Sequence, residues 1–169
     1  MKKESVYRKV CLALAAVLLI PLWVATASCA EQKPAPKGPS LYERIGGINM
    51  VAALVDDVVE RSYVDEVFNA NPRIVEAHKR FPKTTYKFNA TALACMVMGG
   101  PQKYTGRSLK DAHQHLWVTE KEWTAFTAIL HDSLDSFKIP QQEQDEFFAI
   151  IESTKGDVVV PSAKAAENR

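Results

Sequence analysis

Apolar side chains recur at spacings of three and four residues along most of the chain after residue 40, the pattern of helices that bury one face. No stretch of this region alternates strongly between apolar and polar residues, as a half-buried strand would. Two stripes mark the longest predicted helices: Met50, Val51, Leu54 and Val58 in the first, and Trp123, Phe126, Leu130, Leu134 and Phe137 in the second. The pattern therefore predicts an all-α domain.

Local signals mark the ends of the predicted helices. Gly46-Gly47 precedes the first long helix, while Thr119 and Glu122 form a capping box at the start of the second. Pro140 fits the first turn of a last helix, and Gly156 fits just past its end. Three apolar residues of that helix are predicted to form its buried side: Phe147, Phe148 and Ile151.

A helix over about residues 84–98 is predicted to have one face of mixed character. At about 100° per residue, that face carries Tyr86, Asn89, Ala90, Leu93, Met96 and Val97. Phe88 and Cys95 point the other way. An ordinary core helix rarely places Asn and Tyr among apolar side chains, but a helix that covers a cofactor pocket can, because a small ligand needs a hydrogen-bond donor in dry surroundings. The alternative is that Tyr86 lies at a rim and Asn89 meets solvent.

The first 29 residues have the composition of an export signal. Lys2, Lys3, Arg8 and Lys9 precede an uncharged apolar run over 10–27. Pro21 interrupts this run, which favours cleavage over a membrane-spanning anchor. The residues around Cys29 loosely resemble a lipoprotein box, so a lipid anchor at Cys29 is the alternative to a simple signal peptide. The prediction is an exported protein, either periplasmic or anchored to the membrane as a lipoprotein.

The remaining composition describes one exported domain behind a linker. Residues 30–39 are rich in proline and predict a flexible tether. Removing residues 1–29 removes four basic side chains and Glu4 from totals of 21 basic and 20 acidic residues, which leaves a charge of about −2. This balance gives no basic excess for nucleic acid or an anionic membrane. Cys95 is the one cysteine outside the signal region, so we expect a buried thiol and no internal disulfide.

The chain's four histidines are His78, His113, His115 and His131. Gly99-Gly100-Pro101 ends the mixed helix, and after a turn a short amphipathic segment presents His113, an arrangement that suits an axial metal ligand. His115 is two residues further on and points nearly the opposite way on a helix. His131 lies at the flank of an apolar stripe. A zinc site from His113 and His115 would need strand geometry and further ligands.

These motifs resemble the truncated haemoglobins of the first group over residues 40–155, in an exported bacterial form. The matching segments are Ser40 to Gly47, Gly99-Gly100-Pro101, Tyr104-Thr105-Gly106, His113, and Leu116 to Thr119. The resemblance implies a truncated globin fold, a two-over-two helical sandwich, in residues 40–157, with 158–169 as a disordered tail. It also implies haem b, and the chain has no Cys-x-x-Cys-His motif for covalent attachment.

The resemblance assigns roles to individual residues. It makes His113 the proximal ligand of the haem iron, six residues before the helix cap at Thr119. It also selects side chains expected to line the haem pocket: Tyr86, Asn89, Ala90 and Leu93 on the distal side, Tyr104 and Lys110 near the propionates, and Leu116 beside the proximal helix.

The distal side departs from the family pattern. In this group, a tyrosine of the first long helix commonly hydrogen-bonds the bound oxygen, but the corresponding positions here are Val58 and Val59. The usual phenylalanine of the following corner corresponds to Asn71-Pro72. Phe68 or Phe81 is the candidate to take over stacking on the cofactor. About six additional residues before Tyr86 contain His78, which is the candidate sixth iron ligand.

The predicted function is a haem-binding globin that binds oxygen, nitric oxide or another small diatomic molecule. Nitric oxide oxidation and peroxidase-like turnover require the same iron, so the sequence leaves enzymatic activity open. Two alternatives remain: a haem-free interaction module that keeps the globin fold, and a six-coordinate electron-transfer protein with His78 or Tyr86 as second ligand. The sequence makes no prediction about oligomeric state.

Overall fold

The computed structural model describes residues 38–161, and this part of the chain is built from helices. They are α2 (Leu41–Ile45), α3 (Gly47–Val64), α4 (Glu66–Asn69), α5 (Pro72–Arg80), α6 (Lys83–Val97), α7 (Leu109–His113), α8 (Glu120–Ser136), α9 (Gln141–Ser153) and α10 (Lys155–Val158). The only β-type pairing among the described residues is an isolated parallel bridge between Val118 and Val159. The predicted all-α class is confirmed.

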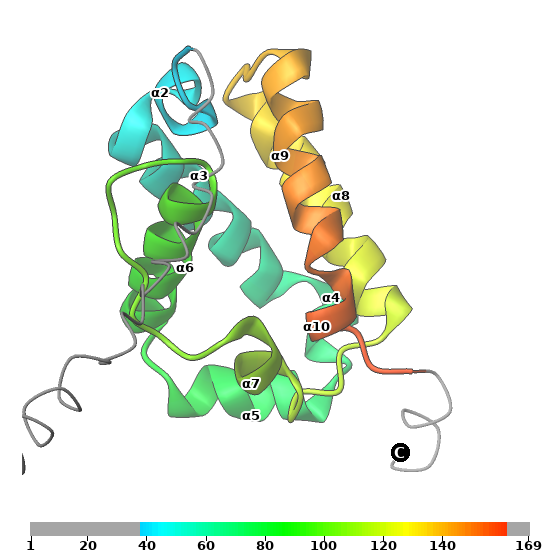
Figure 1. The fold of residues 1–169 in the computed structure, drawn as a ribbon. Coiled ribbons are helices and arrows are strands. Elements are labelled where there is room, and N and C mark those ends of the chain that lie inside the picture. The colour runs from blue at the N-terminus through cyan, green and yellow to red at the C-terminus, as the bar shows by residue number, and fades with distance from the viewer. Residues whose placement is uncertain (1–37, 162–169) are drawn as a thin grey trace, which may run out of the picture. The chain divides into compact units, whose positions relative to one another are not determined.

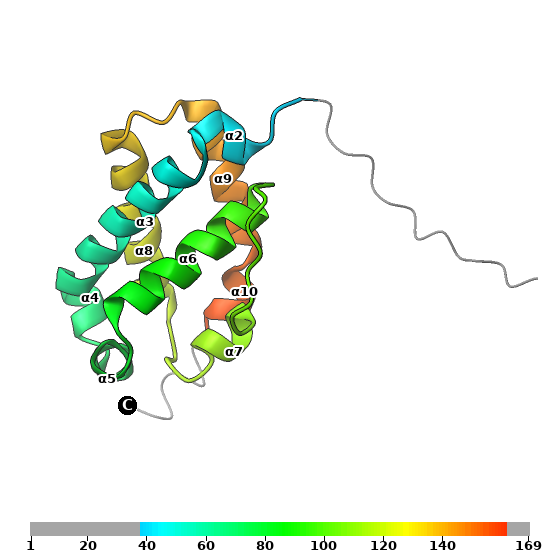
Figure 2. The same cartoon turned by 90° about the vertical axis from the view of Figure 1, so that its left-hand side faces the viewer.

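The long helices form two pairs. Figure 1 shows α3 with α6 and α8 with α9, and Figure 2 shows the first pair in front of the second. The helix α3 contacts both α6 and α8, so it joins the two layers. The short helices α5 and α7 are both at the lower end of Figure 1, and Figure 2 shows them separated from each other. The helix α5 leads into the start of α6, while α7 lies beside α10 (Figure 2).

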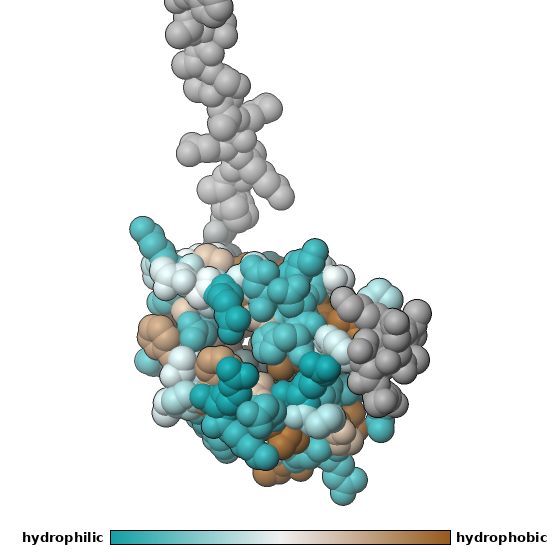
Figure 3. All heavy atoms as spheres, turned by 90° about the horizontal axis from the view of Figure 1, so that it is seen from below, coloured by the Kyte–Doolittle hydropathy of each residue, from teal (hydrophilic) through white to brown (hydrophobic). Residues whose placement is uncertain are grey.

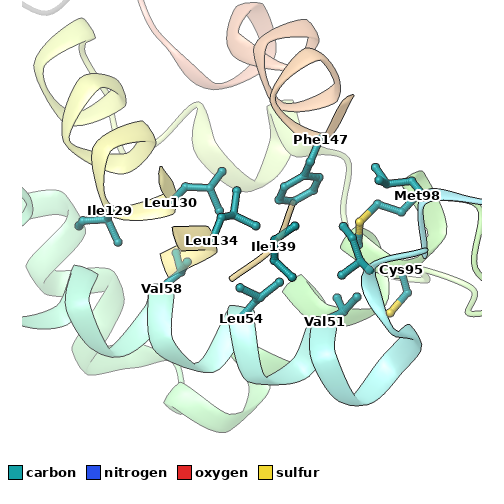
Figure 4. Close-up of a cluster of buried hydrophobic side chains, with 12 residues drawn as sticks. Val51, Leu54, Val58, Cys95, Met98, Ile129, Leu130, Leu134, Ile139 and Phe147 are labelled. Carbon is teal, nitrogen blue, oxygen red and sulfur yellow. The ribbon is translucent and has the colours of Figure 1, made fainter. Parts of the chain in front are cut away.

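The core fills the space between the two layers (Figure 4). Its members come from α2, α3, α8 and α9 and from the end of α6: Leu41, Ile45, Val51, Leu54, Val58, Cys95, Met98, Ile129, Leu130, Leu134, Ile139 and Phe147. The two apolar stripes thus face each other across this core, as their spacing predicts. Phe126, Phe137, Phe148 and Ile151 pack against it while remaining partly accessible.

The helix ends agree with the sequence in part. The capping box of α8 is present, with both the Thr119 and the Glu122 hydrogen bonds. Pro140 is the residue before α9 and not part of its first turn. The prediction for Gly156 is wrong, because α9 ends at Ser153 and Gly156 lies inside α10. Thr154 is the cap residue after α9, and its hydroxyl donates to the carbonyl oxygen of Ile151 (2.7 Å).

Two motifs that lie far apart in the sequence pack against each other. The backbone N–H of Tyr42 donates to the carbonyl oxygen of Met98 (3.0 Å), which joins α2 to the end of α6. A Cβ atom at Gly100 would lie 2.8 Å from the Cys95 carbonyl oxygen and 2.8 Å from the Tyr42 ring. Gly99, next to it, has a φ of +85°, which favours glycine. The glycine pair is therefore required by this close approach.

Backbone hydrogen bonds to the rest of the domain continue past residue 157, the predicted end of the domain. The N–H of Val160 donates to the carbonyl oxygen of Val118 (2.9 Å), directly after the β-bridge at Val159. The predicted export signal, Cys29, most of the linker and residues 162–169 lie outside the described part. Within residues 38–161, no helix has the length and apolar character needed to cross a bilayer.

Candidate functional site

One face of α6 is left accessible by the surrounding helices. Cys95 is the only buried residue of the helix and points into the core, opposite to that face, as predicted. Ala90 and Leu93 on the predicted face are half-buried, while Tyr86 is 47% exposed. Met96 and Val97 of the same predicted face are also exposed, and so is Phe88, which was predicted to point away from that face. The helix therefore presents an apolar surface that no other described element covers.

Tyr86 is partly exposed and is also surrounded by many protein atoms. Burial among neighbouring atoms raises the pKa of its phenol above the ordinary value, and Tyr63 raises it further. The space-filling view from below shows a mostly hydrophilic face with a hollow near its middle (Figure 3). Among the described residues, the Tyr86 hydroxyl forms no hydrogen bond.

Asn89, the second predicted distal donor, is engaged within its own helix. Its Nδ2 donates to the carbonyl oxygen of Thr85 at 2.9 Å. Bonding to a carbonyl one turn earlier is a common arrangement for short polar side chains inside helices. Asn89 therefore keeps one free N–H on its amide, while its other N–H is held by its own helix.

His113 ends the short helix α7, which begins after the cap residue Ser108. Its Nδ1 lies 2.8 Å from the carbonyl oxygen of Leu109. A carbonyl oxygen can only accept, so Nδ1 carries the proton and Nε2 keeps its lone pair. Burial lowers the pKa of His113, the bond to Leu109 raises it, and His115 lowers it, with a net decrease. The ring is therefore neutral at neutral pH, which is the form that binds a metal.

The other predicted pocket residues lie around this helix in different ways. His115 is exposed, in contrast to half-buried His113. Lys110 is exposed on α7, and Leu116 is half-buried directly after it. The hydroxyl of Tyr104 donates to the carbonyl oxygen of Arg107 (2.7 Å), and its ring covers Gly106. Tyr104 thus stabilises its own turn.

His78 lies in α5, within the stretch between Pro72 and Tyr86 that is longer than in the family pattern. Its ring stacks on that of Tyr63, and burial lowers its pKa, with Lys83 adding to the decrease. The sequence analysis did not identify Tyr63. It lies four residues after Val59 on the same face of α3, so inspection of the neighbouring helical turn would have found it.

Buried valines and a capping asparagine occupy the positions where this chain departs from the family pattern. Val58 and Val59 are buried in α3. Asn71 caps α5, because its Oδ1 accepts from the N–H groups of Arg73 (3.0 Å) and Ile74 (3.4 Å). Of the two substitute aromatics, Phe68 packs against the core and Phe81 is 45% exposed.

Glu122 is the second functional candidate that sequence reasoning missed, since it was assigned only a capping role. The residue is 7% exposed, and its Oε1 accepts from Nδ2 of Asn71 at 3.1 Å. Burial tends to raise its pKa, but hydrogen bonds from Thr119 and Asn71 outweigh burial and lower it below the ordinary value. Within residues 38–161, no three His, Cys, Asp or Glu side chains gather as a metal site.

The chain is similar to known proteins over most of the described part. Residues 40–160 match the family described as bacterial-like globin. The group 1 truncated haemoglobin of Tetrahymena pyriformis is 24% identical over 123 residues, which cover 73% of this chain and 97% of the relative. The group 1 truncated haemoglobin of Mycolicibacterium paratuberculosis is 26% identical over 112 residues, which cover 66% and 78% of the two chains.

Solved structures have the same fold. The truncated haemoglobin of Tetrahymena pyriformis in its Fe(III) form gives a TM-score of 0.64 at 23% identity, covering 73% of this chain and 100% of that one. The 2/2 haemoglobin of Synechococcus, with covalently attached haem, gives 0.63 at 24% identity, with coverages of 72% and 98%. A group II truncated haemoglobin of Bacillus anthracis gives 0.63 at 18% identity, with coverages of 75% and 95%. The predicted truncated globin fold is confirmed.

Proposed function

Because the chain belongs to the bacterial-like globin family, we propose that it binds haem b without a covalent link and holds the iron through His113. The observation that carries this proposal is the 2.8 Å contact between Nδ1 of His113 and the carbonyl oxygen of Leu109. This contact fixes the tautomer and leaves Nε2 as a ligand, the arrangement that metal-binding histidines use. The absence of a Cys-x-x-Cys-His motif supports non-covalent binding.

The accessible face of α6 fits the flat apolar surface of haem. Ala90, Leu93 and Val97 would contact the ring, and Tyr86 would place its hydroxyl over the distal side. Haem, when bound, supplies an iron with an open sixth position for oxygen or nitric oxide. The hydroxyl of Tyr86 would donate a hydrogen bond to such a ligand, while the amide of Asn89 stays bonded to Thr85.

Lys110 is the better candidate for a propionate partner. It is exposed on α7, three residues before His113, and an ammonium group forms charge-assisted hydrogen bonds with carboxylates. The proton of Tyr104 is already donated to Arg107, so Tyr104 would shape the pocket mouth through its turn. Leu116 would pack beside the proximal helix.

The assignment to the first group and the location of the protein are further parts of the proposal. The segments from Ser40 to Gly47 and from Gly99 to Gly106 support the first group. The basic and apolar segments of residues 1–29 support export, with a lipid anchor if Cys29 is modified. Nitric oxide oxidation and peroxidase-like turnover would use the same iron, so they are activities to assay on the loaded protein.

A second candidate function is electron transfer by a six-coordinate haem. It is favoured by one observation: His78 is half-buried with a lowered pKa, so its imidazole is neutral and able to bind iron. The third candidate is a haem-free interaction module, in which His113 would bind no iron. Absorption spectra of the purified protein separate all three candidates.

The test is an absorption spectrum of the purified protein supplied with haem. We expect an intense Soret band, with one haem bound per chain. His113→Ala should lose that band or leave a loosely held haem with altered bands, because the iron loses its protein ligand. His115→Ala is the matched control, since His115 is exposed two residues away, and it should keep the band. A wild-type protein without a Soret band would establish the haem-free module instead.

A further inference from the structure

The helix that carries His113 cannot hold its own position. It has five residues, Leu109–His113, and follows a stretch over 99–108 without regular structure. Helices this short are unstable in isolation, because nucleation is costly and few internal hydrogen bonds form. The placement of His113 therefore depends on contacts with other parts of the fold, namely the packing of α7 against α10 and the contacts of the flanking segments. The segment His115–Val118, which immediately follows α7, makes several such contacts.

Asn71 contacts this segment from α5. Its Nδ2 donates to the carbonyl oxygen of Leu116 at 3.2 Å and to Oε1 of Glu122 at 3.1 Å. Its Oδ1 meanwhile caps α5. One side chain thus joins the start of α5, the backbone three residues after His113, and the first turn of α8.

Glu122 completes the junction from α8. Its Oε2 accepts from the backbone N–H of Thr119 at 3.0 Å, while Oε1 receives Nδ2 of Asn71. Both carboxylate oxygens are therefore used by groups on either side of the segment. A buried carboxylate left without such donors would be costly, so these bonds favour one arrangement of the junction.

The same segment is also held by Arg73 and by the end of the domain. The guanidinium carbon of Arg73 lies 3.5 Å from the centroid of the Trp117 ring, and Val160 donates to the carbonyl oxygen of Val118. Trp117 has a φ of +52°, a conformation that a bulky residue adopts only where surrounding contacts impose it. The backbone after His113 is thus constrained from three elements.

From these contacts we infer that Asn71 and Glu122 are positioning residues, which set the place of the His113 imidazole by fixing the segment that follows α7. The inference rests on the proposed role of His113 as an iron ligand. Neither residue contacts the imidazole in the structure, so both act through the backbone of Leu116 and Thr119. The corner where the resemblance implies a phenylalanine against the cofactor is here used to hold the proximal helix.

The variants are chosen to separate positioning from helix capping. Asn71→Ser keeps a side-chain oxygen for the cap of α5 but removes both bonds donated by Nδ2. Asp65→Ser is the matched control, because Asp65 caps α4 in the same way and contacts no residue of the segment after His113. Glu122→Gln keeps the size of the side chain while removing its charge, and it serves where Asn71→Ser fails to fold.

Two measurements are made on each full-length variant. The first follows the exchange of the Nδ1 proton of His113 with solvent by NMR in the haem-free protein. We expect about tenfold faster exchange in Asn71→Ser, the equivalent of losing one hydrogen bond. The second records the iron–histidine stretching band by resonance Raman spectroscopy of the ferrous haem-loaded protein. We expect this band to shift in Asn71→Ser and in Glu122→Gln, and to stay in place in Asp65→Ser.

The outcomes separate this inference from the proposed function. Unchanged proton exchange in both Asn71→Ser and Glu122→Gln would overturn the positioning role, even if haem binds normally. An iron–histidine band shift of equal size in Asp65→Ser would also overturn the positioning role, because a loss of stability far from His113 would then be enough to shift the band. Failure of the wild-type protein to take up haem would overturn the proposed function alone, since the NMR measurement still decides whether Asn71 positions His113.

Discussion

The imidazole ring of His78 lies flat against the phenol ring of Tyr63, with the centroids 3.8 Å apart and the planes inclined by 9°. Nζ of Lys83 lies 4.4 Å from the centroid of the same phenol ring. The stack joins α5 to the end of α3. Aromatic pairs of this kind contribute about 0.5–1.5 kcal/mol beyond their buried area. Moving His78 to an iron atom would break this stack, so we expect His78 to stay with Tyr63.

We therefore predict that His78→Ala leaves the iron coordination unchanged. The ferrous protein should be five-coordinate both before and after the substitution, because the Tyr63 stack retains His78. Absorption spectra of the ferric and ferrous forms would show this directly. Six-coordinate, low-spin bands in the wild-type protein that disappear in His78→Ala would instead establish His78 as the sixth ligand and favour electron transfer.

Replacement of Tyr86 by Phe should speed the release of oxygen about tenfold, since a hydrogen bond of about 1.4 kcal/mol is lost. The comparison variant is Asn89→Leu, for which we expect the smaller effect, because the Asn89 amide is held against its own helix by the bond from one of its two N–H groups to Thr85. Stopped-flow release rates on both variants would decide the matter. The reverse order, with Asn89→Leu fast and Tyr86→Phe unchanged, would place Tyr86 at the rim.

Glu122→Gln should weaken the pH dependence of folding stability. The folded pKa of Glu122 lies below its ordinary value of 4.5, so the unfolded chain binds the proton more readily. The stability from the charged form is therefore fully present above pH 4.5 and is lost as pH falls through the folded pKa. We expect the variant to be less stable by about 1 kcal/mol at pH 7 and closer to wild type in acid.

Urea denaturation of the wild-type and variant proteins, at pH 7 and in acid, measures this difference in folding stability. Glu120→Gln is a suitable control, because Glu120 is an exposed member of an ion pair with Lys155 (2.8 Å) on the same first turn of α8. Exposed pairs of this kind contribute little. A stability loss that is the same at both pH values would show that the Glu122 contacts depend on shape and not on charge.

Cys95 should be unreactive toward thiol reagents in the folded protein. Its side chain has 0% exposure, and burial raises the pKa of its thiol, so the reactive thiolate is scarce. In a protein with Cys11 and Cys29 replaced by Ser, we expect no labelled thiol in native buffer and one labelled thiol per chain in urea. Rapid labelling in native buffer, or a disulfide-linked dimer, would contradict this prediction.

The sequence predicts the architecture because the architecture depends on local periodicity. Residues such as Leu54 and Leu130 lie on stripes of fixed spacing, and each stripe selects its buried face without reference to the rest of the chain. The capping box of Thr119 and Glu122 is local for the same reason. The family resemblance selects His113 through the turn before it and the cap after it, which both lie within a few residues.

The parts that sequence reasoning missed depend on long-range contacts. The bonds from Asn71 reach residues 45 and 51 positions away, so no short motif announces them. The stack of Tyr63 on His78 likewise depends on how α5 folds back on α3. Helical periodicity places Asn89 on a face, but it does not tell whether the amide bonds to its own helix. Gly156 fits a helix end by residue type, while Thr154 ends the helix earlier.

The β-bridge between Val118 and Val159 also has a consequence for the order of events during biosynthesis. The backbone behind His113 is paired with residues that the ribosome makes only after every long helix of the domain. Chains fold progressively as they emerge, so a nascent chain can collapse around α3 and α6 while the iron-ligand side is still incomplete. The proximal wall closes only once residue 160 has been synthesised. On the proposed function, we therefore expect stable haem uptake to require a chain that extends to residue 160.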